Sequence, residues 1–239
     1  MATRVAALAD VHGNAPALAA VLEEVERERP DLVVFCGDLT WGPLPGETLA
    51  VVQALELPAQ FVRGNADRMV GDPAHERGVW VAEQLGAEGT AFVHGFDTHV
   101  VAHVDGLGST RFVHGSPRSD EECVTPRTPP ERVREFMDGV PERVVVTAHV
   151  HVSYDRTVDG VRLVGPGSVG RPYEGERGAR WALLGPSVEL RKTDYDHEAA
   201  AERFRASGIP EAGVDVDALL NPITRDEIIE HAESVVFAG

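Results

Sequence analysis

The segment Arg4-Val-Ala-Ala-Leu-Ala-Asp10-Val-His12-Gly-Asn14 is an apolar run that ends in a carboxylate and an imidazole. Such a run predicts a buried first strand, which brings Asp10 and His12 to its C-terminal end. Ligands of open α/β sheets bind at that edge. An Asp-x-His pair there offers oxygen and nitrogen ligands that suit Zn, Mn or Fe. The alternative is an ordinary strand-to-helix turn, because Asp, Gly and Asn favour loops and Asn14 is a good helix N-cap.

Composition and charge limit the classes of protein that the chain can represent. The formal net charge of −17, from 22 Lys and Arg against 39 Asp and Glu, repels polyanions and argues against general nucleic-acid binding. Only two cysteines are present, and Cys36 lies in an apolar run where we expect it to fill the core. No signal-peptide pattern opens the sequence, and no apolar stretch approaches membrane-spanning length. We therefore expect one soluble, cytoplasmic domain over residues 1–239 that does not enter a membrane.

The first third of the chain alternates between strand and helix patterns. A helical pattern separates the first apolar run from a second at residues 32–38, which ends in Asp38. Another helical pattern leads to a short strand that ends in Gly64-Asn65. Strand-helix-strand units have parallel strands, so Asp10, Asp38 and Asn65 should share one edge of a sheet. Taken alone, each Gly-Asp or Gly-Asn ending is also an ordinary turn.

The remainder of the chain is richer in β-branched residues. Residues 98–104 and 109–114 alternate around a glycine-containing turn and predict a hairpin. Residues 143–149 predict a further buried strand, whose end reads His149-Val-His151 and can address two adjacent metal ions. The other expected elements are a helix over 73–85, a helix over 128–137 that opens with a capping box at Thr128, short antiparallel strands at 162–168, 179–184 and 187–192, and a mainly helical C-terminal extension over 195–239.

Five short motifs, each at a predicted strand end, occur in the order of a known family. They resemble the motifs of the calcineurin-like metallophosphoesterase superfamily, in particular its compact bacterial branch, which includes small phosphodiesterases. The motifs are Asp10-x-His12, Gly37-Asp38, Gly64-Asn65, His114-Gly115 and His149-x-His151, within roughly residues 4–170. The resemblance implies an α/β fold, a four-layer α-β-β-α sandwich of mixed sheets, with a two-metal site at one edge.

The resemblance also implies a role for each motif residue. Asp10, His12 and His151 would hold one metal ion, Asp38 would bridge, and Asn65, His114 and His149 would hold the other. Seven such ligands suit two divalent ions, with Mn, Fe, Zn and Ni as candidates, about 3.5–4 Å apart. The implied reaction is hydrolysis of a small phosphodiester or an activated phosphomonoester, by in-line attack of a hydroxide that bridges the ions. Asn65 would also donate its amide to the phosphate.

The other histidines are weighed against structural roles. His94 lies in a second Val-His-Gly and competes with His114, which we favour because Gly-Ser-Pro follows it after a hairpin strand. His99 and His103 alternate on one face of a strand and are expected to pair across it. The remaining histidines of this group lie among charged residues, where we expect them at the surface: His75, His197 and His231.

The triplet Gly64-Asn65-Ala66 departs from larger phosphomonoesterases of the superfamily, which have a histidine in the third place that can protonate the leaving group. Ala66 cannot do acid-base chemistry, which puts poor leaving groups in doubt. Asp67 follows it, and we expect a structural role there, such as a hydrogen bond that orients a ligand histidine.

Two other functions stay open at this point. One is a metal-holding but catalytically idle interaction module of the same fold. The other is a phosphatase with an aspartyl nucleophile, which would require Asp-x-Asp where this chain has Asp10-Val-His12. The sequence also leaves open a homo-oligomer, and whether residues 170–177 shape the pocket or a subunit interface.

Overall fold

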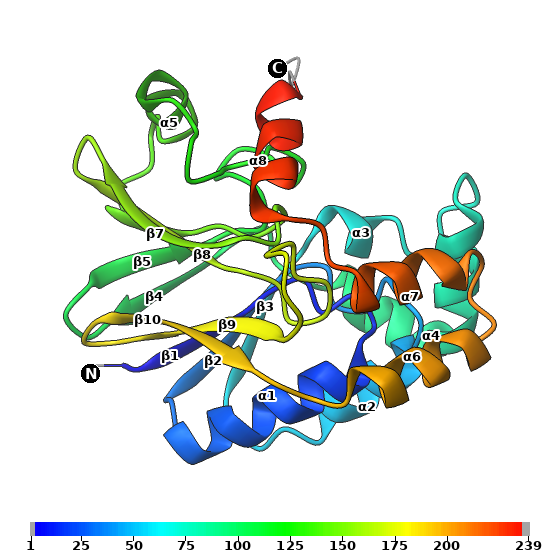
Figure 1. The fold of residues 1–239 in the computed structure, drawn as a ribbon. Coiled ribbons are helices and arrows are strands. Elements are labelled where there is room, and N and C mark those ends of the chain that lie inside the picture. The colour runs from blue at the N-terminus through cyan, green and yellow to red at the C-terminus, as the bar shows by residue number, and fades with distance from the viewer. Residues whose placement is uncertain (1–2, 236–239) are drawn as a thin grey trace.

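The computed structural model describes residues 3–235, so Met1, Ala2 and residues 236–239 of the expected domain and its extension lie outside the described part. Two five-stranded sheets form the centre of the molecule (Figure 1). The first sheet has the order β10-β9-β1-β2-β3, with β1 Val5–Leu8, β2 Leu32–Cys36, β3 Ala59–Val62, β9 Ala179–Leu184 and β10 Val188–Thr193. The second has the order β4-β5-β6-β8-β7, with β4 Val100–Val104, β5 Gly108–Phe112, β6 Val144–Val146, β7 Ser153–Val158 and β8 Val161–Pro166.

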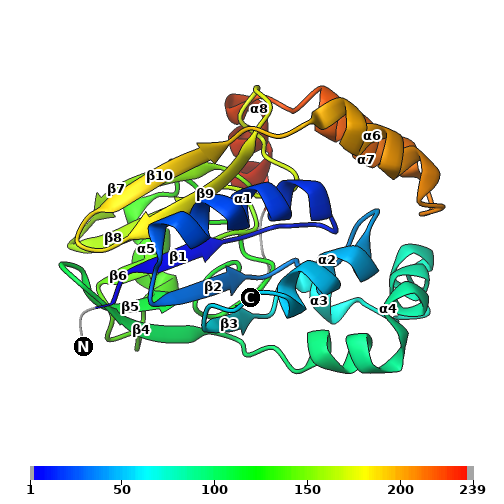
Figure 2. The same ribbon diagram turned by 90° about the horizontal axis from the view of Figure 1, so that it is seen from below.

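Helices cover the outer faces of both sheets, as the two views show (Figures 1 and 2). The described residues form these helices: α1 Ala15–Glu28, α2 Pro45–Gln53, α3 Asn65–Arg68, α4 Glu76–His94, α5 Pro130–Phe136, α6 His197–Ala206, α7 Ala212–Leu220 and α8 Arg225–Ser234. Of these, α6 and α7 lie to one side of the sheets. Every helix of residues 3–235 is too short or too polar to cross a membrane.

Successive side chains of β1 point to opposite faces of the first sheet, and each face is covered by a different layer. Val5 and Ala7 point into the core between the sheets, together with Phe112 of β5. Ala6 and Leu8 point the other way, into the core beneath α1. Because both faces of this strand are buried, its sequence is continuously apolar rather than alternating. The predicted four-layer α-β-β-α sandwich is confirmed.

The pairing of the strands sets the edge on which the site is built. β1 pairs parallel with β2, and β2 with β3, as the strand-helix-strand pattern predicts. In the second sheet β6 pairs parallel with both β5 and β8. The predicted hairpin is also present, because β4 and β5 pair antiparallel. In each sheet the carboxyl ends of these parallel strands therefore lie along one edge, and the two sheets pack face to face.

Asn14 begins α1 as predicted and also ties it to a distant segment. Its Oδ1 accepts a hydrogen bond from the backbone N–H of Ala17 at 3.1 Å, which satisfies one unpaired donor of the first turn. Its Nδ2 donates to the carbonyl of Gly170 at 2.9 Å and to the hydroxyl of Tyr195 at 3.0 Å. One buried side chain thus joins the first helix to residues 170 and 195.

Two local predictions are wrong, and tertiary contacts explain the first. The expected capping box at Thr128 does not form, because its Oγ1 donates to Glu233 of α8 at 2.9 Å and α5 begins later, at Pro130. The helix expected over 73–85 begins at Glu76 and continues to His94, across a break at Gly86 with φ of 66°. The sequence pattern also missed β7, whose central residues are exposed or half-buried and polar.

The C-terminal extension divides between two faces of the molecule. Helices α6 and α7 pack beside the start of α1, with Phe204 and Leu219 against Ala15. Helix α8 instead packs on the outer face of the second sheet, where its Ile229 shares a core with Phe136 of α5. The helical character predicted for this segment is present throughout residues 197–234, apart from two short connections.

Phe204→Ala is expected to destabilise the fold by about 3–5 kcal/mol, because it removes a fully buried aromatic ring and leaves a cavity. Phe204 is 2% exposed, whereas Val214 on the neighbouring helix is 50% exposed, so Val214→Ala is the matched control with little effect. Urea unfolding followed by circular dichroism measures both. Equal midpoints for the two variants would show that α6 does not contribute to the folded core.

Candidate metal centre

All seven residues that the sequence pattern selected follow strands whose carboxyl ends lie at one edge of the molecule. Asp10 and His12 follow β1, Asp38 follows β2, Asn65 follows β3, His114 follows β5, and His149 and His151 follow β6. Six of them form two candidate metal-binding clusters, in each of which the ligand atoms lie within 4.8 Å of one another. The clusters are Asp10, His12 and His151, and Asp38, His114 and His149.

The backbone at this edge is strained. Five of the seven residues have positive φ: Asp10 (52°), His12 (47°), Asp38 (53°), His149 (68°) and His151 (58°). Residues other than glycine rarely adopt this region, and each instance costs on the order of 1 kcal/mol or more. Strain concentrated at several strand ends that meet is typical of a functional site, because there the backbone must turn to aim side chains at a shared point.

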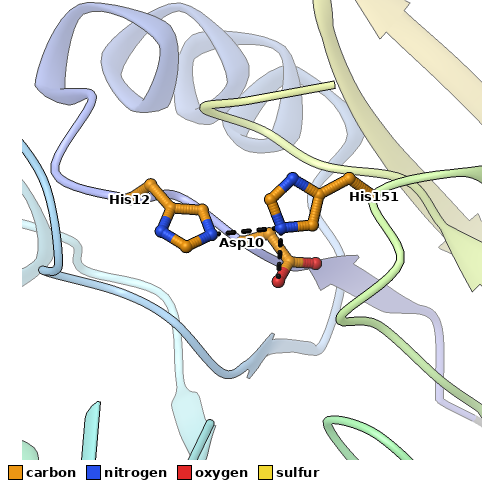
Figure 3. A group of neighbouring side chains, drawn as sticks. All are labelled: Asp10, His12 and His151. Atoms are coloured by element: carbon orange, nitrogen blue, oxygen red, sulfur yellow. Dashed lines mark hydrogen bonds and ion pairs between the residues drawn. The ribbon is translucent and has the colours of Figure 1, made fainter. Parts of the chain in front are cut away.

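The first cluster brings three electron-rich atoms together (Figure 3). Nε2 of His12 lies 3.1 Å from Nε2 of His151, which in turn lies 3.4 Å from Oδ1 of Asp10. Oδ1 of Asp10 is buried and has no hydrogen-bond partner among residues 3–235. Burying a carboxylate oxygen without a hydrogen-bond donor costs free energy, and a positive charge beside the atom would reduce that cost.

The other ring nitrogens of this cluster fix the tautomer that each imidazole adopts when it carries one proton. Nδ1 of His12 contacts the carbonyl oxygen of Trp41 at 3.1 Å, and Nδ1 of His151 contacts that of Arg171 at 2.6 Å. A carbonyl oxygen only accepts, so each Nδ1 carries the proton and each neutral Nε2 presents a lone pair. Two lone pairs and a carboxylate oxygen that face one another fit a metal cation, and the carbonyl contacts are typical of metal-binding histidines.

The second cluster repeats this arrangement. Nδ1 of His114 donates to the carbonyl of Cys36 at 2.9 Å. Its Nε2 faces Oδ1 of Asn65 at 3.0 Å and Nδ1 of His149 at 3.2 Å. When His114 is neutral, its lone pair converges with an amide oxygen and a second ring nitrogen. The donor set of this cluster therefore also fits a divalent cation.

Asp38 belongs to the second cluster and also lies close to the first. Its Oδ2 is 3.6 Å from Nε2 of His12 in the first cluster and 3.5 Å from Nε2 of His114 in the second. Its Oδ1 accepts a hydrogen bond from the backbone N–H of Ala66 at 2.9 Å, which orients the carboxylate. A single oxygen within reach of both groups is the geometry that a bridging ligand requires.

Burial and charge set the protonation of these rings. Burial lowers the pKa of His12 well below its usual value and that of His149 to about 3, so both are neutral, the form in which imidazole binds metals. Burial also opposes charge on His114, but the carboxylates of Asp38 and Asp10 outweigh it and raise its pKa. Burial would raise the pKa of Asp10, but the neighbouring histidines lower it to about 2. The charges that attract a proton to His114 also attract a cation.

Asp67 holds the backbone of the site rather than a histidine. Its Oδ2 accepts from the N–H groups of Asp38 at 2.8 Å and Gly64 at 2.9 Å, and its Oδ1 accepts from Leu39 at 3.0 Å. The structural role that the sequence suggested is thus correct, but the expected bond to a ligand histidine is wrong. At Gly64 a Cβ atom would lie 2.1 Å from Oδ1 of Asp38, so only glycine leaves room for the carboxylate.

The histidines outside the clusters are spread over the surface. His94 is exposed on α4 and its Nε2 contacts the carbonyl of Val70 at 2.9 Å. His99 is exposed and lies before the first paired residue of β4, Val100, so the pairing expected across the strand is wrong for His99 and present for His103. His103 lies opposite Ser109, at the far end of β5 from the site and about 16 Å away along an extended strand.

The remaining sequence assignments are largely confirmed. His75 and His231 are exposed. His197 is half-buried, because its ring packs against Tyr195 at 4.0 Å between centroids, so its expected exposure is only partly met. Cys36 is buried in the core between the sheets, as expected.

The sequence left open whether residues 170–177 shape the pocket or a subunit interface, and two of them lie beside the first cluster. The ring of Tyr173 stacks on His151 at 4.6 Å and 12°. The guanidinium of Arg171 lies over Tyr173 and pairs with Asp215 at 3.9 Å, but its Nε is buried without a hydrogen-bond partner in the described part of the chain. The segment 170–177 therefore contributes to the wall of the site. Trp41 and Arg171 contact the histidines through carbonyl oxygens, which every residue has, so no side-chain signal in the sequence could mark them.

His114→Ala should lower the content of bound divalent metal by about half, because it removes a central ligand of one of two clusters. His94→Ala is the matched control, since it removes an equally sized ring from outside the clusters, and it should keep the wild-type content. Elemental analysis of protein dialysed after Mn loading measures both, with circular dichroism to confirm folding. The reverse pattern would show that the ligand assignment is wrong.

Comparisons with known proteins place the chain in a family. A family model described as the calcineurin-like phosphoesterase superfamily domain matches residues 3–185. An uncharacterized protein of Methanocaldococcus jannaschii is 23% identical over an alignment 240 residues long. The alignment covers 87% of this chain and 94% of that protein. The fold is similar to that of a hypothetical protein from Pyrococcus horikoshii OT3, with a TM-score of 0.81 and 23% identity over 94% of this chain and 100% of the other. It is also similar to a metallophosphoesterase from Sphaerobacter thermophilus, with a TM-score of 0.73 and 25% identity over 92% and 99%. The chain belongs to the calcineurin-like phosphoesterase superfamily.

Proposed function

We propose that the chain is a two-metal hydrolase of a small phosphodiester or an activated phosphomonoester, with the diester preferred. The observation that carries this proposal is the position of Asp38 Oδ2, 3.6 and 3.5 Å from ring nitrogens of the two clusters. When bound, a pair of divalent ions such as Mn supplies a nucleophile at neutral pH and neutralises charge on the phosphate oxygens. The net charge of −17 supports a small ester as the partner rather than a nucleic acid.

The chain's own residues would orient and stabilise the phosphate. Oδ1 of Asn65 faces His114, and its Nδ2 has no hydrogen bond to the described residues, so this amide can donate to a phosphate oxygen. Arg171 acts electrostatically on His12, which places a positive charge beside the first cluster. Its buried Nε has a proton to donate. Fixed donors of this kind stabilise the charge that develops on the oxygens in the transition state.

A metal-holding but catalytically idle module of the same fold is the second candidate. It would need neither two clusters that share a carboxylate nor unpaired donors beside them. Turnover of a phosphodiester separates the candidates, because an idle module binds the metal and leaves the ester intact.

Asp38→Asn is expected to cut hydrolysis by at least about 100-fold, because an amide is a poorer bridge for two cations than a carboxylate. The measurement is release of nitrophenolate from bis(p-nitrophenyl) phosphate by Mn-loaded protein. Asp105→Asn, an exposed change in the turn between β4 and β5, is the matched control and should keep the wild-type rate. Wild-type turnover by Asp38→Asn would overturn the two-metal proposal.

The dependence of rate on the leaving group should be steep. Ala66 provides no acid, and His103 is too far from the site to protonate the departing oxygen. A positioned general acid typically contributes about 10²–10⁴-fold, and without it the rate depends on the leaving group's own pKa. We therefore expect kcat/KM for a series of aryl phosphodiesters to fall sharply as the pKa of the phenol rises.

A shallow dependence would contradict that expectation. The residue to examine would then be Tyr173, since burial raises the pKa of its phenol and keeps it protonated beside His151. Tyr173→Phe would make the dependence steep again if this phenol supplied the proton.

A further inference from the structure

A pocket of about 260 Å³ adjoins the second cluster. A water molecule occupies about 30 Å³ in the liquid, so a carboxylate or phosphate group fits into this space. The pocket is lined by three arginines, three hydroxyl side chains, one carboxylate, one proline and the cluster residue His114: Arg63, Arg68, Arg118, Thr98, Ser116, Ser119, Asp120 and Pro117.

Two of the three arginines are neutralised by acidic partners. Arg68 donates to Asp120 at 3.1 and 3.3 Å and to Glu121 at 2.7 Å. Arg118 donates to Glu122 at 2.9 and 2.6 Å. These pairs hold the side chains in place, but they leave little net charge for a ligand.

Arg63 differs from the other two. It forms no ion pair within residues 3–235, and its Nε is buried without a hydrogen-bond partner. Asp120, the carboxylate in the pocket lining, influences it through charge but already accepts both bonds from Arg68. A buried N–H group of a guanidinium is costly when it has no acceptor, so an acceptor beside this Nε would be stabilising.

The position of Arg63 is fixed relative to the metal centre. It directly precedes Gly64-Asn65, and its backbone N–H donates to the carbonyl of Asp97 at 2.7 Å. In the same pocket Oγ of Ser119 accepts from the N–H of Glu121 at 3.1 Å, so its hydroxyl proton can be donated to a ligand. Arg63 and the Ser119 hydroxyl therefore offer hydrogen-bond donors on the same pocket.

We propose that this pocket binds a second anionic group, a carboxylate or a phosphate, at the end of an ester arm of the substrate. The inference rests on the proposed function, because it takes the attacked phosphorus to lie at the metal centre beside the pocket. Guanidinium donors match both anions through paired N–H groups, so Arg63 would select a substrate with a charged arm over one with a neutral arm.

Binding of two phosphonates to Mn-loaded protein tests the proposal without turnover. The probes are 4-carboxybenzylphosphonate and 4-carbamoylbenzylphosphonate, which differ in the charge of one end and contain a P–C bond that is not hydrolysed. Calorimetry should show that the wild type binds the carboxylate at least about tenfold more tightly. Arg63→Met should reduce that preference to within about twofold. Arg143→Met, an exposed change at the start of β6 away from the site, should preserve it.

A third probe, 4-phosphonobenzylphosphonate, distinguishes the two sources of the anion. Binding tighter than that of the carboxylate would assign the pocket to a phosphate, and weaker binding would assign it to a carboxylate. Should Arg63→Met lower the melting temperature, Arg63→Gln serves as the second variant, because it keeps a polar group while removing the charge.

Equal affinities of the wild type for the carboxylate and the carboxamide would overturn the proposal, as would a preference that survives in both Arg63 variants. Hydrolysis of bis(p-nitrophenyl) phosphate is measured on the same samples. Turnover without charge preference would leave the proposed function intact and remove the inference. Charge preference without turnover would keep the anion site and remove the proposed function.

Discussion

One carboxylate oxygen, Oδ2 of Asp38, lies within 3.6 Å of a ring nitrogen from each of two histidine groups, and the surrounding structure serves to keep it there. The carboxylate of Asp67 accepts hydrogen bonds from the backbone N–H groups of Asp38 and Gly64 and so holds these two segments together. Gly64 leaves room for the carboxylate where any Cβ would collide with it. The carboxylate oxygen and the lone pairs of neutral imidazoles repel one another at these distances, so a cation bound between them would stabilise the arrangement.

Much of this design can be predicted from sequence, because burial of β1 and β2 on both faces demands continuous apolar runs. Parallel pairing then forces Asp10 and Asp38 to one edge, so the fold and the first ligands follow from a short-range pattern. The choice of His114 over His94 needs more than spacing, since both lie in Val-His-Gly, and it depends on whether a strand or a helix precedes the histidine.

Other features depend on contacts between segments far apart in the chain. β9 and β10 return from the second half of the sequence to complete the first sheet, with β9 antiparallel to β1, and no local pattern specifies that return. Thr128 does not form the expected helix cap, because its hydroxyl donates a hydrogen bond to Glu233, more than a hundred residues away in the sequence. The carbonyls that orient His12 and His151 also come from distant turns and carry no side-chain signature.

Positive side chains lie beside the carboxylates of the site, although the molecule as a whole is acidic. A net charge of −17 keeps polyanions away, whereas two guanidinium groups with unsatisfied Nε protons, Arg63 and Arg171, lie beside the two clusters. Anomalous diffraction from Mn-soaked crystals, recorded on both sides of the Mn absorption edge, tests the shared bridge most directly. The account predicts two Mn peaks about 3.5–4 Å apart with Asp38 between them. A single peak, or two peaks that Asp38 does not join, would contradict it.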